Sequence, residues 1–280
     1  MTLLAPAGGA ALVGPGPGEV QRLLAWESAE VRALLTGDGE SAARKWRQEL
    51  VGVETAVAYS RSSELRAGLA KLAPRVVTRD PEPPPQVHAA RWLASALEAL
   101  DGALDVEAVP ALLAATPGEE REAATWRRQL PAGFVALHPG SGSPAKTWPV
   151  DRFRALQQRL APGHATLVVL GPAEAGLAAA FASDCVVAQA LPLRVLGAVL
   201  AHAGLFVGND SGVSHLAAAW GAPTLALFGP TDPRTLAPEG AHVRTLRGAG
   251  GCLDQLSIED VQRAAEELRE QKSLANGAAH

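Results

Sequence analysis

The fold is decided by the stretch from Phe206 to Pro230, which reads FVGNDSGVSHLAAAWGAPTLALFGP. Apolar runs at 205–207 and 224–228 predict two short buried parallel strands, with a helix over 213–220 between them. Residues 208–212 supply the glycines and small polar residues that favour a sharp turn and a helix N-cap. A βαβ unit this tight directs the N–H groups of the helix start toward the strand ends, where an anion such as a phosphate binds favourably.

Three polar side chains gather at this helix start: Asp210, Ser211 and His215. On a helix, Ser211 and His215 are four residues apart and share a face. In an arbitrary loop, the ordinary interpretation would be that Asp210 or Ser211 is an N-cap and His215 a surface residue. The length of the surrounding pattern favours a binding site instead.

The composition limits the functions open to the chain. It has 280 residues, enough for two domains, and a net charge of −4, which disfavours a nucleic-acid binder. Its two cysteines are far apart, so we expect neither a disulfide framework nor a cysteine metal site. No apolar run approaches the roughly 18 residues of a membrane span, and no basic segment follows Met1. We therefore expect a cytoplasmic protein.

Alternating strand and helix patterns predict an α/β protein with parallel sheets. The strongest break in composition is 80–85, which contains four prolines; an apolar helix pattern follows at 87–100. We expect an N-terminal α/β domain over 1–110, an interdomain connection over 111–133, a C-terminal Rossmann-like domain over 134–256, and a closing helix and tail over 257–280.

A second glycine-rich loop follows the expected strand at 134–137 and reads His-Pro-Gly-Ser-Gly-Ser-Pro-Ala-Lys-Thr-Trp-Pro. Residues 140–147 nearly match the phosphate loop of nucleoside triphosphatases. However, Ala145 replaces the second glycine, and Trp148-Pro149 interrupts the helix that must begin at Lys146-Thr147. The sequence therefore disfavours a nucleoside triphosphatase.

Both loops resemble glycosyltransferase family 9, the ADP-heptose:lipopolysaccharide heptosyltransferases. The first match is Gly-Asn-Asp-Ser-Gly-x-x-His-Leu-Ala-Ala-Ala-x-Gly-x-Pro, followed by Phe-Gly-Pro-Thr, at 208–231; the second is His-Pro-Gly-Ser-Gly with Lys-x-Trp-Pro at 138–149. The resemblance is good over 134–268 and faint over 2–100. It implies a GT-B type α/β fold, with two Rossmann-like domains facing a cleft and a reduced N-terminal domain.

The resemblance also implies the function and the residues that carry it. The chain would bind a nucleotide-diphospho-sugar, ADP-heptose in this family, and transfer the sugar with inversion to a lipopolysaccharide-core-like or other glycan. The acceptor would be a glycan or a lipid-linked glycan, reached by peripheral contact with the inner membrane surface. No metal or other cofactor is expected, because Lys146 and the helix start would offset the pyrophosphate charge. The expected donor-binding residues are Ser141, Lys146, Glu174, Asp210, Ser211, Gly212 and His215.

One family motif is missing. Family 9 chains begin with a strand followed by Arg-x-Gly-x-x-Gly-Asp, whose aspartate is the proposed general base, and no such motif occurs here. Either 2–5 is the family's second strand and the catalytic loop lies upstream of Met1, or Glu19 in Gly-Glu-Val is the base. We favour the first, since Glu19 lacks the preceding arginine and lies among prolines. A non-catalytic nucleotide-sugar-binding relic of the family stays open as an alternative.

Overall fold

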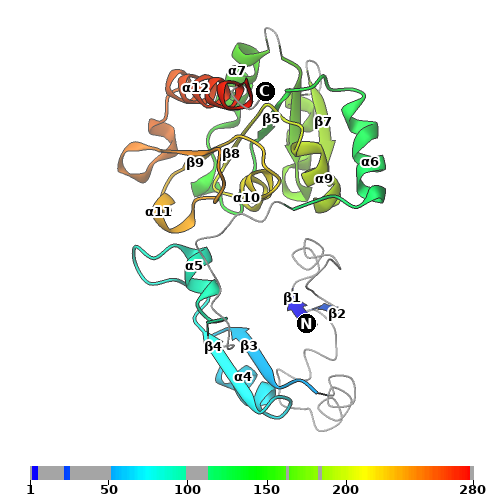
Figure 1. The fold of residues 1–280 in the computed structure, drawn as a ribbon. Helices are drawn as coiled ribbons and strands as arrows, with labels where there is room; N and C mark the ends of the chain where they lie inside the picture. Colours follow the sequence, from blue (N-terminus) through cyan, green and yellow to red (C-terminus); the bar gives the residue numbers. More distant parts are fainter. Residues whose placement is uncertain are drawn as a thin grey trace. The chain divides into compact units, whose positions relative to one another are not determined.

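In a computed structural model, the chain forms two compact units, Met1–Ala108 and Val109–His280 (Figure 1). The structure describes residues 2–5, 22–25, 52–98, 113–161, 164–181 and 185–277. The candidate base Glu19 lies outside these residues.

Among its described residues, the N-terminal unit forms two pairs of parallel strands. β1 (Thr2–Ala5) pairs with β2 (Arg22–Ala25), and β3 (Thr55–Tyr59) pairs with β4 (Arg75–Arg79). Helix α4 (Ser63–Ala70) connects β3 to β4 and begins where the Ser62 hydroxyl accepts a hydrogen bond from the Leu65 N–H. The strand expected at 2–5 and the βαβ order expected here are confirmed.

Helix α5 (Ala89–Ala94) is shorter than the helix expected over 87–100. His88 accepts the Ala90 N–H through its ring and so marks the helix start. At the other end, the Ser95 hydroxyl donates to the Trp92 carbonyl, and the Ala96 N–H bonds to the Leu93 carbonyl three residues back. Such bonds tighten the chain into turns and compete with a continuing helix.

The C-terminal unit is built on a six-stranded sheet in which every pair is parallel. The strands are β5 (Val135–His138), β6 (Thr166–Leu170), β7 (Val186–Gln189), β8 (Leu205–Asn209), β9 (Thr224–Phe228) and β10 (Val243–Arg247). Their order is β10-β9-β8-β5-β6-β7. The first three strands in sequence thus run outward from β5, and the last three run outward in the other direction from β8. This is the order of a Rossmann sheet.

Helices alternate with these strands. They are α6 (Pro117–Arg127), α7 (Val150–Leu160), α8 (Ala178–Phe181), α9 (Leu193–Leu200), α10 (Gly212–Ala219), α11 (Pro233–Leu236) and α12 (Ile258–Gly277), with 3₁₀ turns at Pro144–Lys146, Pro172–Leu177, Ala249–Gly251 and Leu253–Gln255. The closing helix is confirmed as α12, which packs beside α7 (Figure 1). Its start is fixed by Ser257, whose hydroxyl accepts the Asp260 N–H at 3.1 Å. Among the helices that the structure describes, none combines the length and the apolar character that crossing a bilayer requires.

The core surrounds the central strands, and every residue of β5, β6, β8 and β9 is buried. Trp148 anchors the loop after β5 in this core. It is fully buried, meets the Phe153 ring edge-on with centroids 5.0 Å apart, and donates its indole N–H to the Leu256 carbonyl at 3.1 Å. A loop that would otherwise be mobile is therefore held at both ends, by β5 and by Trp148.

The strand order determines where a ligand can bind. β5 and β8 are neighbours, but their following connections lead to opposite sides of the sheet. At such a switch point the loops diverge and leave a crevice at the carboxyl ends of the strands. The motif at 138–149 and the first part of the motif at 208–231, residues 208–215, lie at this point.

Candidate functional site

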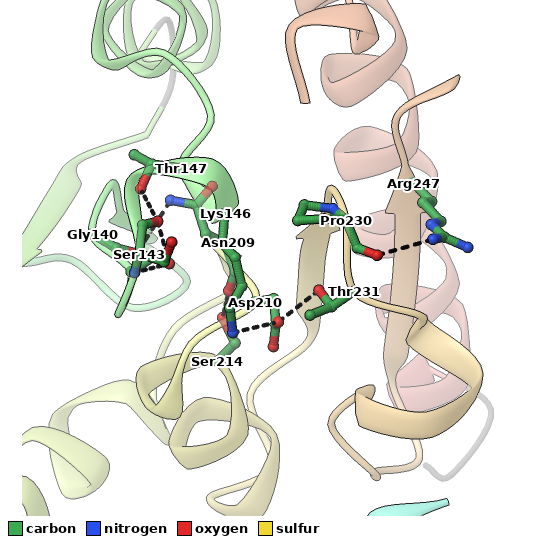
Figure 2. Close-up of polar contacts among 11 residues, drawn as sticks. Gly140, Ser143, Lys146, Thr147, Asn209, Asp210, Ser214, Pro230, Thr231 and Arg247 are labelled. Atoms are coloured by element: carbon green, nitrogen blue, oxygen red, sulfur yellow. Dashed lines mark hydrogen bonds and ion pairs between the residues drawn. The ribbon is translucent and has the colours of Figure 1, made fainter. Parts of the chain in front are cut away.

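Asn209, the last residue of β8, holds the two motif loops together (Figure 2). Its buried amide nitrogen donates to the carbonyls of Pro139 and Gly140 at 3.0 and 3.1 Å, and its amide oxygen accepts the Trp148 N–H at 2.9 Å. One side chain therefore fixes both ends of the loop after β5 to the end of β8. Because all three bonds are buried, replacing the amide would leave several backbone groups without partners.

Lys146 and Asp210 meet between these loops. The Lys146 ammonium donates to Asp210 Oδ2 at 3.0 Å, across 64 residues of sequence. The Asp210 side chain is 7% exposed and that of Lys146 is 30% exposed, so the carboxylate lies inside the site and the ammonium at its mouth. Thr231, after β9, donates its hydroxyl to the same Oδ2 atom at 2.8 Å (Figure 2). The arrangement holds a cation at the switch point.

Helix α10 begins directly after Asp210. Ser211 is its N-cap, with extended backbone angles, and makes no side-chain capping bond. Within the described part of the chain, the buried Ser211 Oγ has no hydrogen-bond partner. A side chain built on Gly212 would meet only open space, so the first turn of the helix is accessible. His215 is exposed one turn further along. A helix start with these properties suits an anion.

Glu174 lies in the 3₁₀ turn that follows β6. Its Oε2 accepts the Gly171 N–H at 2.9 Å. A Cβ atom on Gly140 would lie 2.4 Å from the Glu174 carboxyl carbon, so position 140 must be glycine for the carboxylate to lie there. The nearby His138 is buried and its Nδ1 bonds to the Val169 carbonyl at 2.9 Å. Because burial penalises the charged ring, the pKa of His138 is lowered from its ordinary value.

The Ser141 side chain forms hydrogen bonds within its own loop. Its hydroxyl donates to the Ser143 carbonyl at 3.2 Å and accepts the Ser143 N–H at 3.3 Å. The Thr147 hydroxyl also donates to the Ser143 carbonyl, at 3.1 Å. These bonds stiffen the turn that precedes Lys146, so the ammonium approaches Asp210 from a braced segment.

All of the residues that the sequence analysis assigned to the donor thus lie at the carboxyl ends of three strands, β5, β6 and β8. Of these residues, Lys146 and Asp210 are in direct contact. Asn209 and Thr231 were not predicted as site residues, although both stand inside the quoted pattern, in Gly-Asn-Asp and Gly-Pro-Thr. Among the described residues, no group of three or more His, Cys, Asp or Glu side chains is placed to hold a metal ion.

The family model described as glycosyltransferase family 9 (heptosyltransferase) matches residues 50–265. Lipopolysaccharide heptosyltransferase 1 of Escherichia coli is 31% identical over 134 residues, which are 46% of this chain and 41% of that protein. The matched part therefore spans less than half of this relative's length.

Solved structures resemble a much larger part of the chain. A family 9 glycosyltransferase from Veillonella parvula has a TM-score of 0.78 at 20% identity, covering 96% of this chain and 87% of its own. The E. coli heptosyltransferase WaaC with ADP has a TM-score of 0.66 at 23% identity, covering 95% and 89%. At these identities the likeness shows the fold, and the expected α/β fold of GT-B type is confirmed.

Proposed function

Because the chain belongs to glycosyltransferase family 9, the heptosyltransferase family, we propose that it is a glycosyltransferase whose C-terminal unit binds a nucleotide-diphospho-sugar. One observation carries the proposal: the Lys146–Asp210 pair stands at the switch point between β5 and β8, beside an accessible helix start. A lysine and a helix N-terminus that converge on one crevice supply the positive potential that a diphosphate requires.

Each side chain then has a role. Lys146 binds the diphosphate, together with the N–H groups of Ser211 and Gly212. Glu174, at the far side of the crevice, accepts hydrogen bonds from the nucleoside. Asp210 and His215 orient the sugar. The buried Ser211 hydroxyl, which has no hydrogen-bond partner among the described residues, supports this assignment because a ligand oxygen would satisfy it.

The donor proposed is ADP-heptose and the acceptor a glycan of the lipopolysaccharide core, reached by peripheral contact with the inner membrane surface. Support comes from the named relatives: an E. coli heptosyltransferase has been solved with ADP and with ADP-2-deoxy-2-fluoro heptose. These partners belong to those proteins, and their transfer to this chain is part of the proposal.

The reaction is a single displacement at the anomeric carbon. The acceptor oxygen forms a bond to that carbon while the bond to the diphosphate oxygen breaks, which inverts the configuration. A base takes the acceptor proton, and ADP departs with the electron pair. Lys146 and the start of α10 stabilise the charge that develops on the departing diphosphate. The base is proposed to be Glu19, which lies outside the described residues.

Binding of ADP tests the donor site directly. We expect Lys146→Ala to weaken ADP binding by about 1.5–3 kcal/mol, the range for a hydrogen bond to a charged group. Isothermal titration calorimetry measures the dissociation constant, and circular dichroism verifies the fold. Lys71→Ala is the matched control, because Lys71 caps α4 in the N-terminal unit; its ADP affinity should equal that of the wild type.

Two outcomes would overturn the proposal. Absence of ADP binding at millimolar concentration would remove the donor site altogether, and an unchanged affinity in Lys146→Ala would remove the role of the lysine. A donor-binding protein without activity would remain the alternative. Release of ADP from ADP-heptose, measured with and without a lipopolysaccharide-core acceptor, separates that alternative from an enzyme.

A further inference from the structure

Among the described residues, two side chains bond to the Asp210 carboxylate, and both meet the same oxygen. Lys146 Nζ lies 3.0 Å from Oδ2 and Thr231 Oγ1 lies 2.8 Å from it. One partner is a cation on a flexible stem, and the other is a neutral hydroxyl on a short β-branched side chain. The two therefore differ in how easily they leave the carboxylate.

Lys146 is the partner that can leave. It makes one side-chain contact with Asp210, is 30% exposed, and carries three N–H donors on a rotatable chain. In the proposed function, this ammonium turns toward the diphosphate when the donor binds. The Asp210 side chain, only 7% exposed, would then lose its cation. A carboxylate in such a place needs another donor, since an unmet acceptor bears the full cost of its desolvation.

Thr231 is the partner that stays, because its loop is fixed from both sides. Gly229 packs against the loop that carries Lys146: a Cβ atom there would lie 3.2 Å from the Ala145 carbonyl oxygen and 3.1 Å from Leu253. On the outer side, Arg247 at the end of β10 donates to the Gly229 carbonyl at 3.2 Å. It also donates to the Pro230 carbonyl at 3.2 Å (Figure 2). The hydroxyl is therefore presented from a braced turn.

We propose that Thr231 is a positioning residue, which keeps the Asp210 carboxylate satisfied and oriented while Lys146 moves from Asp210 to the donor's diphosphate. Arg247 supports it by holding the Gly229–Pro230 turn. This inference rests on the proposed function, because it presupposes that a diphosphate takes Lys146. It adds Arg247 on β10 to the site and gives a role to Thr231, which lies at the end of the first motif but was not among the expected donor-binding residues.

Affinity for ADP tests whether Thr231 keeps Asp210 satisfied when Lys146 moves to the diphosphate. Thr231→Val keeps the shape of the side chain and removes the hydroxyl. We expect it to raise the ADP dissociation constant about tenfold, equivalent to ~1.4 kcal/mol, because Lys146 then leaves behind a carboxylate with no donor. Thr231→Ser restores the hydroxyl and should stay within about threefold of the wild type. Thr235→Val, on α11, is the control for a threonine-to-valine change in the same segment and should have no effect.

A double-mutant cycle separates this role from a merely structural one. In an Asp210→Asn background the residue at 210 no longer holds Lys146 as a counter-ion, so Thr231→Val should change ADP affinity by less than about twofold. An effect that persists in this background would mean that Thr231 acts elsewhere and would overturn the inference. So would wild-type affinity in Thr231→Val while Lys146→Ala is impaired, a result that leaves the proposed function standing. If Lys146→Ala also binds normally, the proposed function itself fails.

Discussion

Two partly buried ion pairs of the C-terminal unit, Arg194–Glu119 and Lys146–Asp210, differ in how many hydrogen bonds the cation makes. Arg194 on α9 donates to both carboxylate oxygens of Glu119, at 2.6 and 3.2 Å, and also to the Ala114 carbonyl at 2.8 Å. Its guanidinium lies 5.8 Å from the centre of the Trp220 ring. Lys146 makes a single contact with Asp210. The arginine is thus committed to several partners, whereas the lysine retains donors for a ligand.

The first pair holds elements of the chain together, whereas in the proposed function the second pair exchanges Asp210 for a ligand. Glu119 also accepts the Thr116 N–H at 2.7 Å and closes the capping box at the start of α6. Arg194 therefore attaches α6 and the segment before it to α9. Lys146 instead approaches from a glycine and serine loop at the switch point. Both pairs are partly buried, so burial alone would not distinguish them; the number of donors already engaged does.

Breaking the Arg194–Glu119 pair should have the largest effect, which is on the free energy of unfolding. We expect Arg194→Met to lower the free energy of unfolding by about 2–4 kcal/mol, because the partly buried Glu119 carboxylate loses its ion-pair partner. Urea denaturation followed by circular dichroism measures this change. The ADP affinity, corrected for the fraction of the protein that is folded, should equal that of the wild type. A variant as stable as the wild type would show that the pair contributes little to the attachment of α6.

Exchanging lysine for arginine at position 146, and arginine for lysine at position 194, tests the difference between the two ion pairs. Lys146→Arg places a planar fork opposite Asp210, where bidentate pairing holds the cation more firmly. We expect ADP binding to weaken by about 1 kcal/mol, roughly fivefold, with the free energy of unfolding unchanged or slightly higher. Calorimetry and denaturation measure the two quantities on one preparation. The reciprocal Arg194→Lys should lower stability and leave ADP affinity alone; wild-type affinity in Lys146→Arg would contradict the view of Lys146 as an exchangeable partner.

The smallest effect concerns pH. The hydrogen bond from Arg194 holds the pKa of Glu119 below its ordinary value of 4.5. A carboxyl with a depressed folded-state pKa stabilises the fold above its unfolded pKa and loses that stabilisation as the pH falls through the folded value. Glu119→Gln should therefore cost about 1 kcal/mol near neutrality, and the difference from the wild type should shrink below pH 4.5. A difference that is constant down to pH 3 would mean that charge plays no part.

The elements around the site could be predicted from the sequence because their signals are local. The strands expected at 205–207 and 224–228 are β8 and β9, and the helix expected over 213–220 is α10, shifted by one residue. Short apolar runs between glycines and prolines are typical of buried parallel strands, which depend little on distant contacts. The family motifs added the expectation that the donor binds at the ends of these strands.

The contacts within the site could not be predicted in the same way. Asn209 reads locally as a turn residue, and its role appears only when the loop after β5 is folded against it. Thr231 reads as part of a turn, and its bond to Asp210 spans 21 residues and a strand. The loss of helix after Ala94 depends on Ser95, whose hydroxyl competes locally with the backbone in a way that apolar spacing does not reveal.

The amide of Asn209 also has a consequence for how the protein folds. Its bonds to Pro139 and Gly140 close a segment of about 70 residues, and the neighbouring β5–β8 pairing closes the same interval. Contacts between residues this distant in sequence stabilise the chain only after the entropy cost of closing a long loop has been met. They therefore slow the folding of parallel sheets. We therefore expect refolding to yield a helical intermediate before the central pairing forms, with ADP binding gained in one late step. Stopped-flow circular dichroism alongside binding of a fluorescent ADP analogue would time the two events, and simultaneous recovery would contradict this order.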